Sequence, residues 1–566
     1  MSQPGEATVN PLAAEAQRGG CIENKGGSVA PLPYAPSNRE LKLHWMCEKM
    51  KEERWDMSSA KPLRIFCGTW NVNCKVLNSD VGESLHPWLL PADHAPSDIY
   101  AIGFQEIVEL NPYNVVVTGN ESQDKSIYWF NQVKKTLDSS SEQFTLIKSD
   151  HIVGISLCIF AKDSVSPAIS DVRVAITRIG ILGLLGNKGA VTIRLNVYNS
   201  TMAFVCSHLR AQQSAVVGRN EDYSAILGRT ILHPNPINTQ AEDDLTPSQQ
   251  WRLVDTEKEL QILEHDFIFW LGDLNYRVDF SEKMTLPELL ETINNGDWSQ
   301  ILELDQLVRQ RAIGNVFSGF NEGQITFQPT YKFQPGTNRY EQRPDKKKRA
   351  PAWCDRVLWK DTHAATNSKL GYGVTQLLYA SAVELCPSDH KPVMSIFTCS
   401  ALLCTNDKER ETYTKLLNIM DKWENYNSPK MSVEGNVIDI ESIDVDIPVT
   451  KSITIKNTGK CPVAWFFVPK ADDTMISPSW FKISVLKGIL EPGGEKLVEI
   501  IVDVNSTNQE LAAIDKNSRL QEIVVIRVSG GSDFFVIIDI KRVTHSKRQS
   551  ALVDMGNVFP NNDGHF

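Results

Sequence analysis

The sequence lacks the features that mark membrane-spanning, secreted and lipid-anchored chains. None of its apolar runs approaches the ~20 residues that a transmembrane helix needs. The N-terminal residues lack the basic-then-apolar order of a secretion signal, and the last four residues contain no cysteine for a prenyl anchor. We therefore expect a cytoplasmic protein that binds membranes only peripherally.

Disulfide and zinc-binding patterns are also missing. The chain has 11 cysteines, an odd number, and several stand inside apolar runs, as Cys67, Cys158 and Cys206 do. Neither a disulfide framework nor a CxxC array for zinc fits this spacing. Scattered cysteines of this kind indicate a reducing, intracellular compartment.

An excess of positive charge is absent as well. The chain carries 58 Lys and Arg residues against 69 Asp and Glu residues, and its net charge is −11. Proteins that bind nucleic acids usually present broad basic surfaces, so we expect no nucleic-acid partner. A site for a polyanion must therefore be a local basic patch.

What is present is the pattern of a large α/β domain followed by a small β domain. Between about residues 62 and 400, strand-like apolar runs alternate with helical stretches, among them 245–264 and 285–311. Several strands are apolar on both faces, which indicates layered sheets covered on both sides. After residue 429, short strands separated by NTG, PGG and GGS turns are typical of a β-sandwich of about seven strands.

These patterns predict the fold class and the domain boundaries. The fold is a layered α/β sandwich followed by a small all-β, immunoglobulin-like sandwich. The expected segments are a disordered N-terminal stretch (1–37), the α/β domain with an N-terminal helix (38–400), a linker helix (401–428), the β-sandwich (429–545) and a loose tail (546–566).

The strand predicted at 267–271 indicates where the chemistry takes place. Its apolar residues are followed by Gly272, Asp273, Leu274 and Asn275. If the alternation of a strand continues through the glycine, Asp273 and Asn275 lie side by side at its carboxyl end. Asp and Asn are also common in turns, so this stretch alone fits either a turn or an active site.

Other strands of the first domain end in the same way. The polar residues at or beside predicted strand ends are Asn71, Glu106, His208, Asp273, Asn275, Asp355, Asp389 and His390. A single residue of this kind is usually a solvated loop residue. A whole set predicts a site, because ligands of α/β proteins gather at strand ends.

The residue types point to metal-assisted hydrolysis of a phosphoester. Glu106 and Asn71 offer the hard oxygen ligands that suit Mg²⁺, and no cluster of His and Cys indicates zinc. His208 and His390 can contact a phosphoryl oxygen or move a proton, and Asp355 can hold His390 in one tautomer. Since no Cys or Ser nucleophile with a partnering base is apparent, water is the expected attacking group.

The motifs that hold these residues resemble those of a known family. TWNVN, GFQEI, GNKGAV, SHL, GDLNYR, PAWCDRVLW and SDHKPV, in this order, resemble the inositol polyphosphate 5-phosphatases of the endonuclease/exonuclease/phosphatase (DNase I-like) superfamily. The β-sandwich resembles the ASH domain that follows the phosphatase in the type II and Lowe-syndrome 5-phosphatases. The tail after it is too short for the RhoGAP-like domain of longer relatives, so we expect that domain to be absent.

The resemblance implies the reaction and the metal ion. The expected reaction is Mg²⁺-dependent removal of the 5-phosphate from phosphatidylinositol 4,5-bisphosphate, related phosphoinositides or soluble inositol polyphosphates, by in-line attack of an activated water. Glu106 resembles the main Mg²⁺ ligand, with Asn71 beside it. Asp273 resembles the residue that orients or deprotonates the water, and Asn275 the residue that grips the phosphate.

The resemblance also implies roles for the remaining polar residues. His208 and His390 resemble the phosphate-contacting histidines, Asp355 the partner of His390, and Asp389 a further acidic residue near the metal ion. One position departs from the family pattern. Many relatives read HLAAH where this chain reads HLRAQ, so Gln212 replaces a second histidine.

A basic stretch, 330–349, is expected to select the substrate. By resemblance, the residues that clasp the 4-phosphate of the inositol ring are Tyr331, Lys332, Lys347 and Arg349. Lys and Arg suit such contacts with phosphate, although a run of this kind is more often a solvated charged surface. Asn187 and Lys188 of the GNKGAV motif are expected on the side of the 1-phosphate.

Two further features concern membranes and partners. The stretch GILGLLG (180–186) is either a buried strand edge or a loop whose Leu184 and Leu185 dip into lipid, and we hypothesise the second. By resemblance, the ASH domain and the linker helix bind Rab-type small GTPases, and the protein lies on endosomal or Golgi membranes or on the plasma membrane. The alternatives are a nuclease or another phosphodiesterase on the same fold, or a Rab-binding scaffold with weak catalysis.

Overall fold

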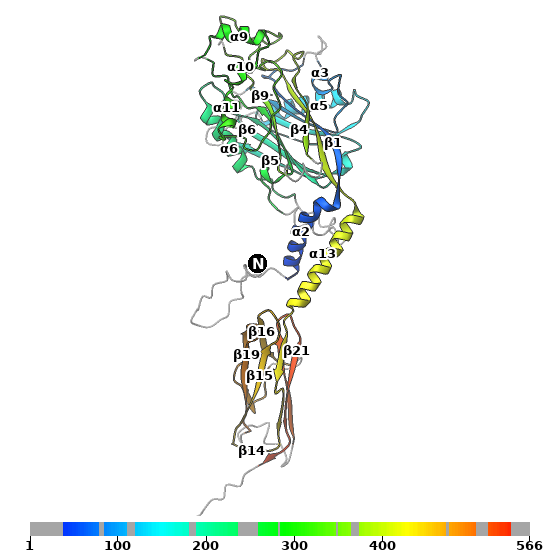
Figure 1. Ribbon diagram of the computed structural model, residues 1–566, viewed down its shortest axis with the longest axis vertical. Helices are drawn as coiled ribbons and strands as arrows, with labels where there is room; N and C mark the ends of the chain where they lie inside the picture. Colours follow the sequence, from blue (N-terminus) through cyan, green and yellow to red (C-terminus); the bar gives the residue numbers. More distant parts are fainter. Residues whose placement is uncertain are drawn as a thin grey trace, which may run out of the picture. The chain divides into compact units, whose positions relative to one another are not determined.

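The computed structural model describes residues 38–77, 84–109, 119–179, 188–235, 258–280, 283–346, 349–363, 373–470, 475–504 and 519–544. The chain divides into two compact units, Met1–Tyr413 and Thr414–Phe566 (Figure 1). None of the described helices is long and apolar enough to cross a membrane. The segments predicted to be disordered or loose, 1–37 and 546–566, lie outside the described residues.

Two β-sheets form the centre of the first unit. One has six strands in the order β10 (Val374–Ser381), β11 (Val393–Cys404), β1 (Ser58–Asn71), β2 (Ile99–Gln105), β4 (Ile155–Lys162) and β3 (Phe144–Ile152). The other has five, in the order β5 (Ile169–Arg178), β6 (Gly189–Val197), β7 (Ser200–His208), β8 (Phe267–Asp273) and β9 (Asp355–Asp361). The pairs β1–β2 and β7–β8 are parallel, and the others are antiparallel.

Alternating side chains place the two sheets face to face. In β1, Ile65 and Cys67 belong to a large apolar core that they share with Phe269 and Leu271 of β8. The residue between them, Phe66, belongs to a different core on the other face of the sheet. Both faces of each central strand are therefore buried, as the apolar runs of the sequence indicated.

Helices cover the outer faces of the sheets. On the six-stranded sheet, Trp70 packs edge-to-face against Trp88 of α3 (His86–Leu89) and Trp129 of α5 (Gly119–Leu137). On the five-stranded sheet, Trp270 packs against Tyr223 of α6 (Val216–Arg229), near α11 (Gln306–Ala312). Figure 1 shows the two pairs of helices on opposite sides of the sheets. The predicted layered α/β sandwich is confirmed.

The other helices of this unit are short, apart from α2 (Asn38–Met57), which lies where the sequence predicts a helix. The helix predicted over 285–311 is broken into α9 (Leu286–Asn294), α10 (Ser299–Leu302) and α11. Gly296, at φ +78°, follows the first of them, and Asp305 caps the last by accepting a hydrogen bond from the amide of Val308 at 2.9 Å. These stop and start signals prevail over the apolar periodicity.

The described part of the first unit also contains the 3₁₀ turns η2 (Ser166–Ala168) and η4 (Ile262–Glu264). The second of them is the only helical turn in the described part of the helix predicted over 245–264. Residues 245–257 of that prediction lie outside the described residues.

A β-sandwich forms the second unit, after the helix α13 (Asn406–Asn427). Its first sheet has the order β12 (Met431–Glu434), β15 (Val449–Asn457), β19 (Glu495–Val502) and β17 (Phe481–Ile483). Its second has the order β13 (Val437–Ile440), β21 (Asp533–Ile540), β20 (Leu520–Val528), β16 (Val463–Val468) and β18 (Lys487–Leu490). A short pair, β14 (Ile443–Asp444) and β22 (Val543–Thr544), stands apart.

Two details differ from the predictions for this part of the chain. The linker helix expected over 401–428 begins only at Asn406, because the four residues from Ala401 to Cys404 continue β11 and pair with the start of β1. The sandwich also has more strands than the seven expected. The four-residue β12 is too short to show a clear alternating pattern in the sequence.

Candidate active site

Polar residues from three neighbouring strands meet at one edge of the five-stranded sheet. The register pairs His208 of β7 with Asp273 of β8, and Asp273 with Asp355 of β9. In β8, Phe269 and Leu271 face the core between the sheets, and Asp273 continues the same alternation. The strands therefore carry a row of polar side chains to the edge of the apolar core.

The six-stranded sheet contributes from the facing side. β1 ends at Asn71, level with Gln105 at the end of the parallel strand β2, and Glu106 follows directly. The side-chain amide of Asn71 donates a hydrogen bond from Nδ2 to Oδ2 of Asp273 at 2.9 Å. The two sheets are thus joined at the site through Asn71 and Asp273.

Gly272 allows β8 to run close to β7 just before Asp273. Its φ is +147°, and a Cβ atom at this position would lie 2.0 Å from the carbonyl oxygen of Ser207. Any other residue would be strained and would push the two strands apart. The glycine of the GDLNYR motif therefore fixes the position of the catalytic candidate that follows it.

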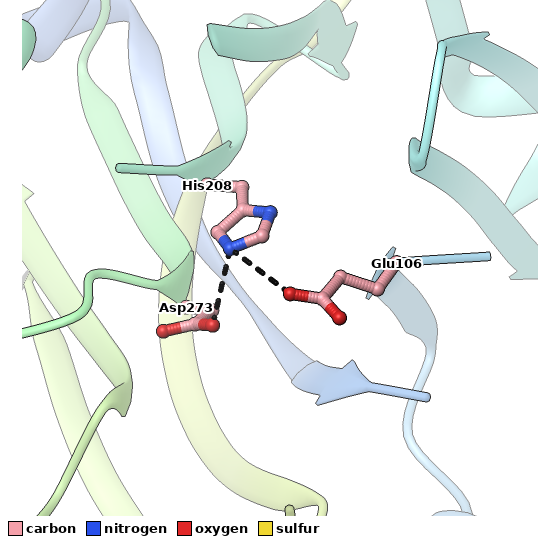
Figure 2. Close-up of side chains that lie close together, drawn as sticks. All are labelled: Glu106, His208 and Asp273. Atoms are coloured by element: carbon pink, nitrogen blue, oxygen red, sulfur yellow. Dashed lines mark ion pairs between the residues drawn. The ribbon is translucent and has the colours of Figure 1, made fainter. Parts of the chain in front are cut away.

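Glu106, His208 and Asp273 form a cluster (Figure 2). Nε2 of His208 lies 3.3 Å from Oδ2 of Asp273 and 3.8 Å from Oε1 of Glu106. Figure 2 shows this ring nitrogen turned toward both carboxylates. The candidate ligand atoms of the three residues lie within 4.8 Å of one another, and Glu106 is the least buried of them. This spacing suits a divalent cation, and the more exposed Glu106 marks the side of the cluster that is open to solvent.

Lys188 reaches the same cluster. Its Nζ lies 2.5 Å from Nε2 of His208. Burial lowers the pKa of Lys188 to about 8, and the charges of Asp273 and Glu106 only partly oppose that effect. The contact with the 1-phosphate expected for Lys188 stays a prediction, but the structure places its amino group among the catalytic candidates.

Asp273 is held in its charged form. Its Oδ1 accepts a hydrogen bond from the backbone amide of Asn275 at 3.0 Å. Burial alone would raise the pKa of Asp273. The hydrogen bond with His208 and the positive charges of His208, His390 and Lys188 outweigh burial and hold that pKa well below its usual range.

His390 and Asp355 form a second buried pair beside the cluster. Nδ1 of His390 lies 2.9 Å from Oδ2 of Asp355, which also accepts a hydrogen bond from the hydroxyl of Thr330 at 2.7 Å. Burial would lower the pKa of His390, but the carboxylates of Asp355 and Asp273 outweigh it and raise that pKa to about 9. Since Nδ1 is bound to Asp355, Nε2 is the nitrogen left for a substrate.

Asn275 does not continue the alternation of β8. The strand ends at Asp273, and Asn275 adopts a left-handed backbone with φ +58°. Its Nδ2 donates to the carbonyl of Leu209 at 3.1 Å. Strand geometry thus persists through the glycine as far as Asp273 but does not reach Asn275, although the backbone amide of Asn275 still contacts Asp273.

Tyr331 and Lys332 lie beside the catalytic candidates. The ring of Tyr331 is 4.5 Å from that of His390, centroid to centroid. Nζ of Lys332 is 3.1 Å from Oδ2 of Asp389. Asp389 therefore holds a cation of the expected 4-phosphate site, a contact that sequence reasoning did not foresee.

Several expected residues lie outside the described part of the chain: Leu184, Leu185, Asn187 and Lys347. The hypothesis of a lipid-dipping loop therefore stays a hypothesis. Arg349 is described and is half-buried.

Sequence reasoning missed two residues that support the site. Thr330 shares Oδ2 of Asp355 with His390, and no motif pointed to it. Arg277 belongs to the GDLNYR motif but had no assigned role, and its guanidinium contacts both Asn275 and Tyr331. The available signal was an arginine in the same short motif as Asp273 and Asn275.

Comparisons with known proteins agree with this arrangement. The family described as Endonuclease/Exonuclease/phosphatase family 2 matches residues 68–396. The family described as Inositol polyphosphate 5-phosphatase OCRL-like, ASH domain, matches residues 433–541. The two matches fall on the α/β part and the β-sandwich, respectively.

Curated relatives are similar over most of the α/β part. A type II inositol 1,4,5-trisphosphate 5-phosphatase of Mus musculus is 32% identical over 488 residues, which are 86% of this chain and 44% of the relative. A synaptojanin of Caenorhabditis elegans is 36% identical over 62% of this chain and 29% of the relative. A type I inositol polyphosphate 5-phosphatase 8 of Arabidopsis thaliana is 33% identical over 62% of this chain and 73% of the relative. The chain thus spans less than half the length of the first two.

One solved structure is similar in both sequence and fold. It is the inositol polyphosphate 5-phosphatase domain of SPsynaptojanin in complex with inositol (1,4)-bisphosphate and a calcium ion. It is 28% identical, with a TM-score of 0.51, and the match covers 69% of this chain and 99% of that one. With the matches above, this likeness shows that the chain belongs to the inositol polyphosphate 5-phosphatases of the endonuclease/exonuclease/phosphatase family and carries an OCRL-like ASH domain.

Proposed function

We propose that this protein removes the 5-phosphate from phosphatidylinositol 4,5-bisphosphate and related phosphoinositides or soluble inositol polyphosphates, with Mg²⁺ as its cofactor. The observation that carries the proposal is the meeting of Glu106, His208 and Asp273 with the Asp355–His390 pair at one edge of the core. Family membership supports the reaction class. The inositol (1,4)-bisphosphate and the calcium ion in the related structure support a headgroup site beside a divalent metal ion.

The residues of the cluster fit a divalent cation. Glu106 and Asp273 supply carboxylate oxygens, which are the ligands that Mg²⁺ prefers, and the more exposed Glu106 leaves room for water ligands. Mg²⁺ bound there would neutralise charge on the phosphoryl oxygens. Asn71, implied as a neighbouring ligand by the resemblance, also fixes Asp273 through its amide nitrogen.

The side chains of the site have separate tasks in this proposal. Asp273, fixed by the backbone amide of Asn275, orients the attacking water in line with the bond that breaks. His208 and His390 contact the phosphoryl oxygens, where negative charge develops in the transition state. Asp355 holds His390 at Nδ1, so that its Nε2 faces the substrate.

The adjacent basic residues are proposed to select the substrate. Lys332 is paired with Asp389 in the structure, and a phosphate next to the scissile one would share this cation. Tyr331 packs on His390 and so lies between the two phosphate positions. The other residues proposed for substrate phosphates are Asn187, Lys188, Lys347 and Arg349.

Phosphate release from a panel of phosphoinositides and soluble inositol phosphates tests the proposal. With Mg²⁺, we expect the wild-type protein to release phosphate only from substrates with a 5-phosphate, and chelation of the metal to abolish release. Asp273→Asn should lower kcat by about 10²-fold or more on every substrate. The exposed Asp163, whose side chain accepts a hydrogen bond from the hydroxyl of Thr145 at 2.7 Å, provides the control Asp163→Asn.

Two outcomes would overturn the proposal. A wild-type protein that releases no phosphate with Mg²⁺ would favour the scaffold alternative. Cleavage of DNA or of a phosphodiester at a rate above that of phosphate release would favour the nuclease and phosphodiesterase alternatives.

We further propose that the ASH domain binds a Rab-type small GTPase and thereby places the enzyme on endosomal or Golgi membranes or on the plasma membrane. The match at residues 433–541 supports this proposal. Strand edges of a sandwich and an amphipathic helix beside it are surfaces that protein partners use. Equal affinity for the GTP-loaded and GDP-loaded forms across a Rab panel would contradict an effector role.

A further inference from the structure

Arg277 is a buried arginine that stands two residues after Asn275. Only 7% of its surface is exposed. Burying a guanidinium is costly unless its donors are satisfied, so its contacts identify what it serves. Its Nε donates to the backbone carbonyl of Asn275 at 3.2 Å, and its Nη2 donates to the side-chain Oδ1 of the same residue.

These contacts determine which way the amide of Asn275 faces. A guanidinium only donates hydrogen bonds, so the amide must present its oxygen to Arg277 and its NH₂ group to the other side. One hydrogen of that NH₂ group goes to the carbonyl of Leu209 at 3.1 Å. The amide is thereby locked with its second hydrogen available for a phosphoryl oxygen.

The same guanidinium supports Tyr331. Its central carbon lies 4.4 Å from the centroid of the Tyr331 ring, a cation–π distance. The Tyr331 ring in turn packs 4.5 Å from the ring of His390, and the next residue, Lys332, pairs with Asp389. Arg277 therefore contacts both the residue proposed to grip the scissile phosphate and the segment proposed to bind its neighbour.

The backbone of Arg277 is anchored to helix α11 and not to a loose loop. Its amide donates to Oε1 of Gln306 at 2.9 Å, and its carbonyl accepts from the amide of Gln306 at 2.8 Å. Oε1 of Gln306 also accepts a hydrogen bond from the buried Arg219 of α6 at 2.5 Å. Because the backbone of Arg277 is held in place, its guanidinium can hold both Asn275 and Tyr331 in fixed positions.

We propose that Arg277 is a positioning residue that fixes the amide of Asn275 toward the scissile phosphate and couples it to the Tyr331–Lys332 segment that binds the neighbouring phosphate. The proposal rests on the proposed function. Lysine cannot replace it, because a point charge on a flexible stem cannot donate to Asn275 at two atoms and stack on Tyr331 at once.

A double-mutant cycle tests the first half of the proposal. Arg277→Lys should lower kcat by about 10²-fold, the usual cost of a misplaced catalytic contact. In an Asn275→Ala background, the same change should lower kcat by about threefold or less, because the amide that Arg277 positions is gone. Equal losses in both backgrounds would overturn the proposal.

A pair of short-chain substrates tests the second half. Arg277→Lys should raise the KM for phosphatidylinositol 4,5-bisphosphate about tenfold more than the KM for phosphatidylinositol 5-phosphate. The second substrate has no 4-phosphate for the Tyr331–Lys332 segment to bind. An equal change for both substrates would overturn the coupling to Tyr331.

Two controls separate positioning from loss of structure. Arg173→Lys removes another buried guanidinium, which contacts Asp171 and the carbonyl of Lys258, and should lower the unfolding temperature without changing kcat.

If Arg277→Lys does not fold, Tyr331→Leu removes the ring from the guanidinium and should lower kcat on phosphatidylinositol 5-phosphate by about threefold or more. An unchanged kcat on that substrate would overturn the proposal. A wild-type protein without activity would overturn the proposed function as well. An active wild-type protein in which Arg277→Lys costs the same with and without Asn275 would overturn only this inference.

Discussion

The buried pair of His390 and Asp355 imposes strict demands on single residues. Oδ2 of Asp355 accepts hydrogen bonds from His390 and Thr330, whereas Oδ1 finds no hydrogen-bond partner among the residues that the structure describes. A carboxylate at this position both orients the imidazole ring and balances its charge. A carboxamide of the same shape has no charge to balance that of the ring, and it can turn its NH₂ group toward Nδ1 and so disturb the orientation of the ring.

We therefore expect Asp355→Asn to lower kcat about 10²- to 10⁴-fold with little change in KM. Phosphate release from phosphatidylinositol 4,5-bisphosphate measures the loss. Thr330→Val is the matched control, because it removes the other donor to the same oxygen and leaves the carboxylate in place. It should cost about tenfold or less, and comparable losses in the two variants would contradict the role given to Asp355.

Lys332 is expected to act on substrate affinity alone. Lys332→Met removes the cation that Asp389 holds 3.1 Å away and should raise KM for phosphatidylinositol 4,5-bisphosphate about tenfold, or ~1.4 kcal/mol. The KM for phosphatidylinositol 5-phosphate should change little. Lys346→Met, which changes an exposed lysine beside Asp345, is the control for a general loss of positive charge. The same KM change in both variants would refute a specific site.

At the scale of elements, a half-buried ion pair connects helix α2 to the start of β8. Nη2 of Arg54 lies 2.6 Å from Oδ1 of Asp266, and Oδ2 of the same carboxylate accepts a hydrogen bond from the amide of Thr201 at 2.9 Å. Asp266→Asn leaves the partly solvated Arg54 without its charge partner and should lower the free energy of unfolding by about 1.5–3 kcal/mol in urea titrations. The exposed pair of Lys134 and Asp138, with the same 2.6 Å separation, provides the control Asp138→Asn at about 1 kcal/mol or less.

The same pair gives a pH dependence whose sign is determined. Burial would raise the pKa of Asp266, but the hydrogen bond with His363 and the charge of Arg54 outweigh it and hold that pKa well below its usual range. A lowered pKa in the folded state stabilises the protein at neutral pH, and this stability is lost as the pH falls below about 4. The difference in unfolding free energy between wild type and Asp266→Asn should therefore shrink on acidification. A difference that is constant from pH 7 to pH 3 would contradict this account.

Elements also show where local patterns mislead. Over 285–311 the apolar periodicity predicted one helix, but Gly296 and the Asp305 cap divide it into three. Conversely, the alternation in β8 correctly indicated that Asp273 leaves the apolar core at its edge, whereas Asn275 turns away with φ +58°. A repeating pattern predicts the interior of an element well and its ends poorly, because capping and turn contacts decide the ends.

At the scale of the whole molecule, the two compact units predict two unfolding transitions. The apolar cores of the α/β part belong to the first unit, and the core of the β-sandwich, around Trp465 and Ile538, belongs to the second. Calorimetry should therefore resolve two transitions. Asp266→Asn should lower the temperature of the transition of the α/β part only. Trp465→Ala should lower the free energy of unfolding of the β-sandwich by about 3–5 kcal/mol and shift only its transition. A single transition that both variants shift would show that the units unfold together.

The sequence by itself determined the order of the motifs, the layered α/β class and the oxygen-rich residue set at strand ends. These properties are local, because alternation and residue type are legible along a few residues of the chain. Only the tertiary structure decided which of those residues meet. His208 and Asp273 come together through the pairing of β7 with β8. The amino group of Lys188 contacts the ring of His208, and the guanidinium of Arg277 contacts the ring of Tyr331. Such contacts join distant parts of the chain, and strand register and packing determine them, not local propensity.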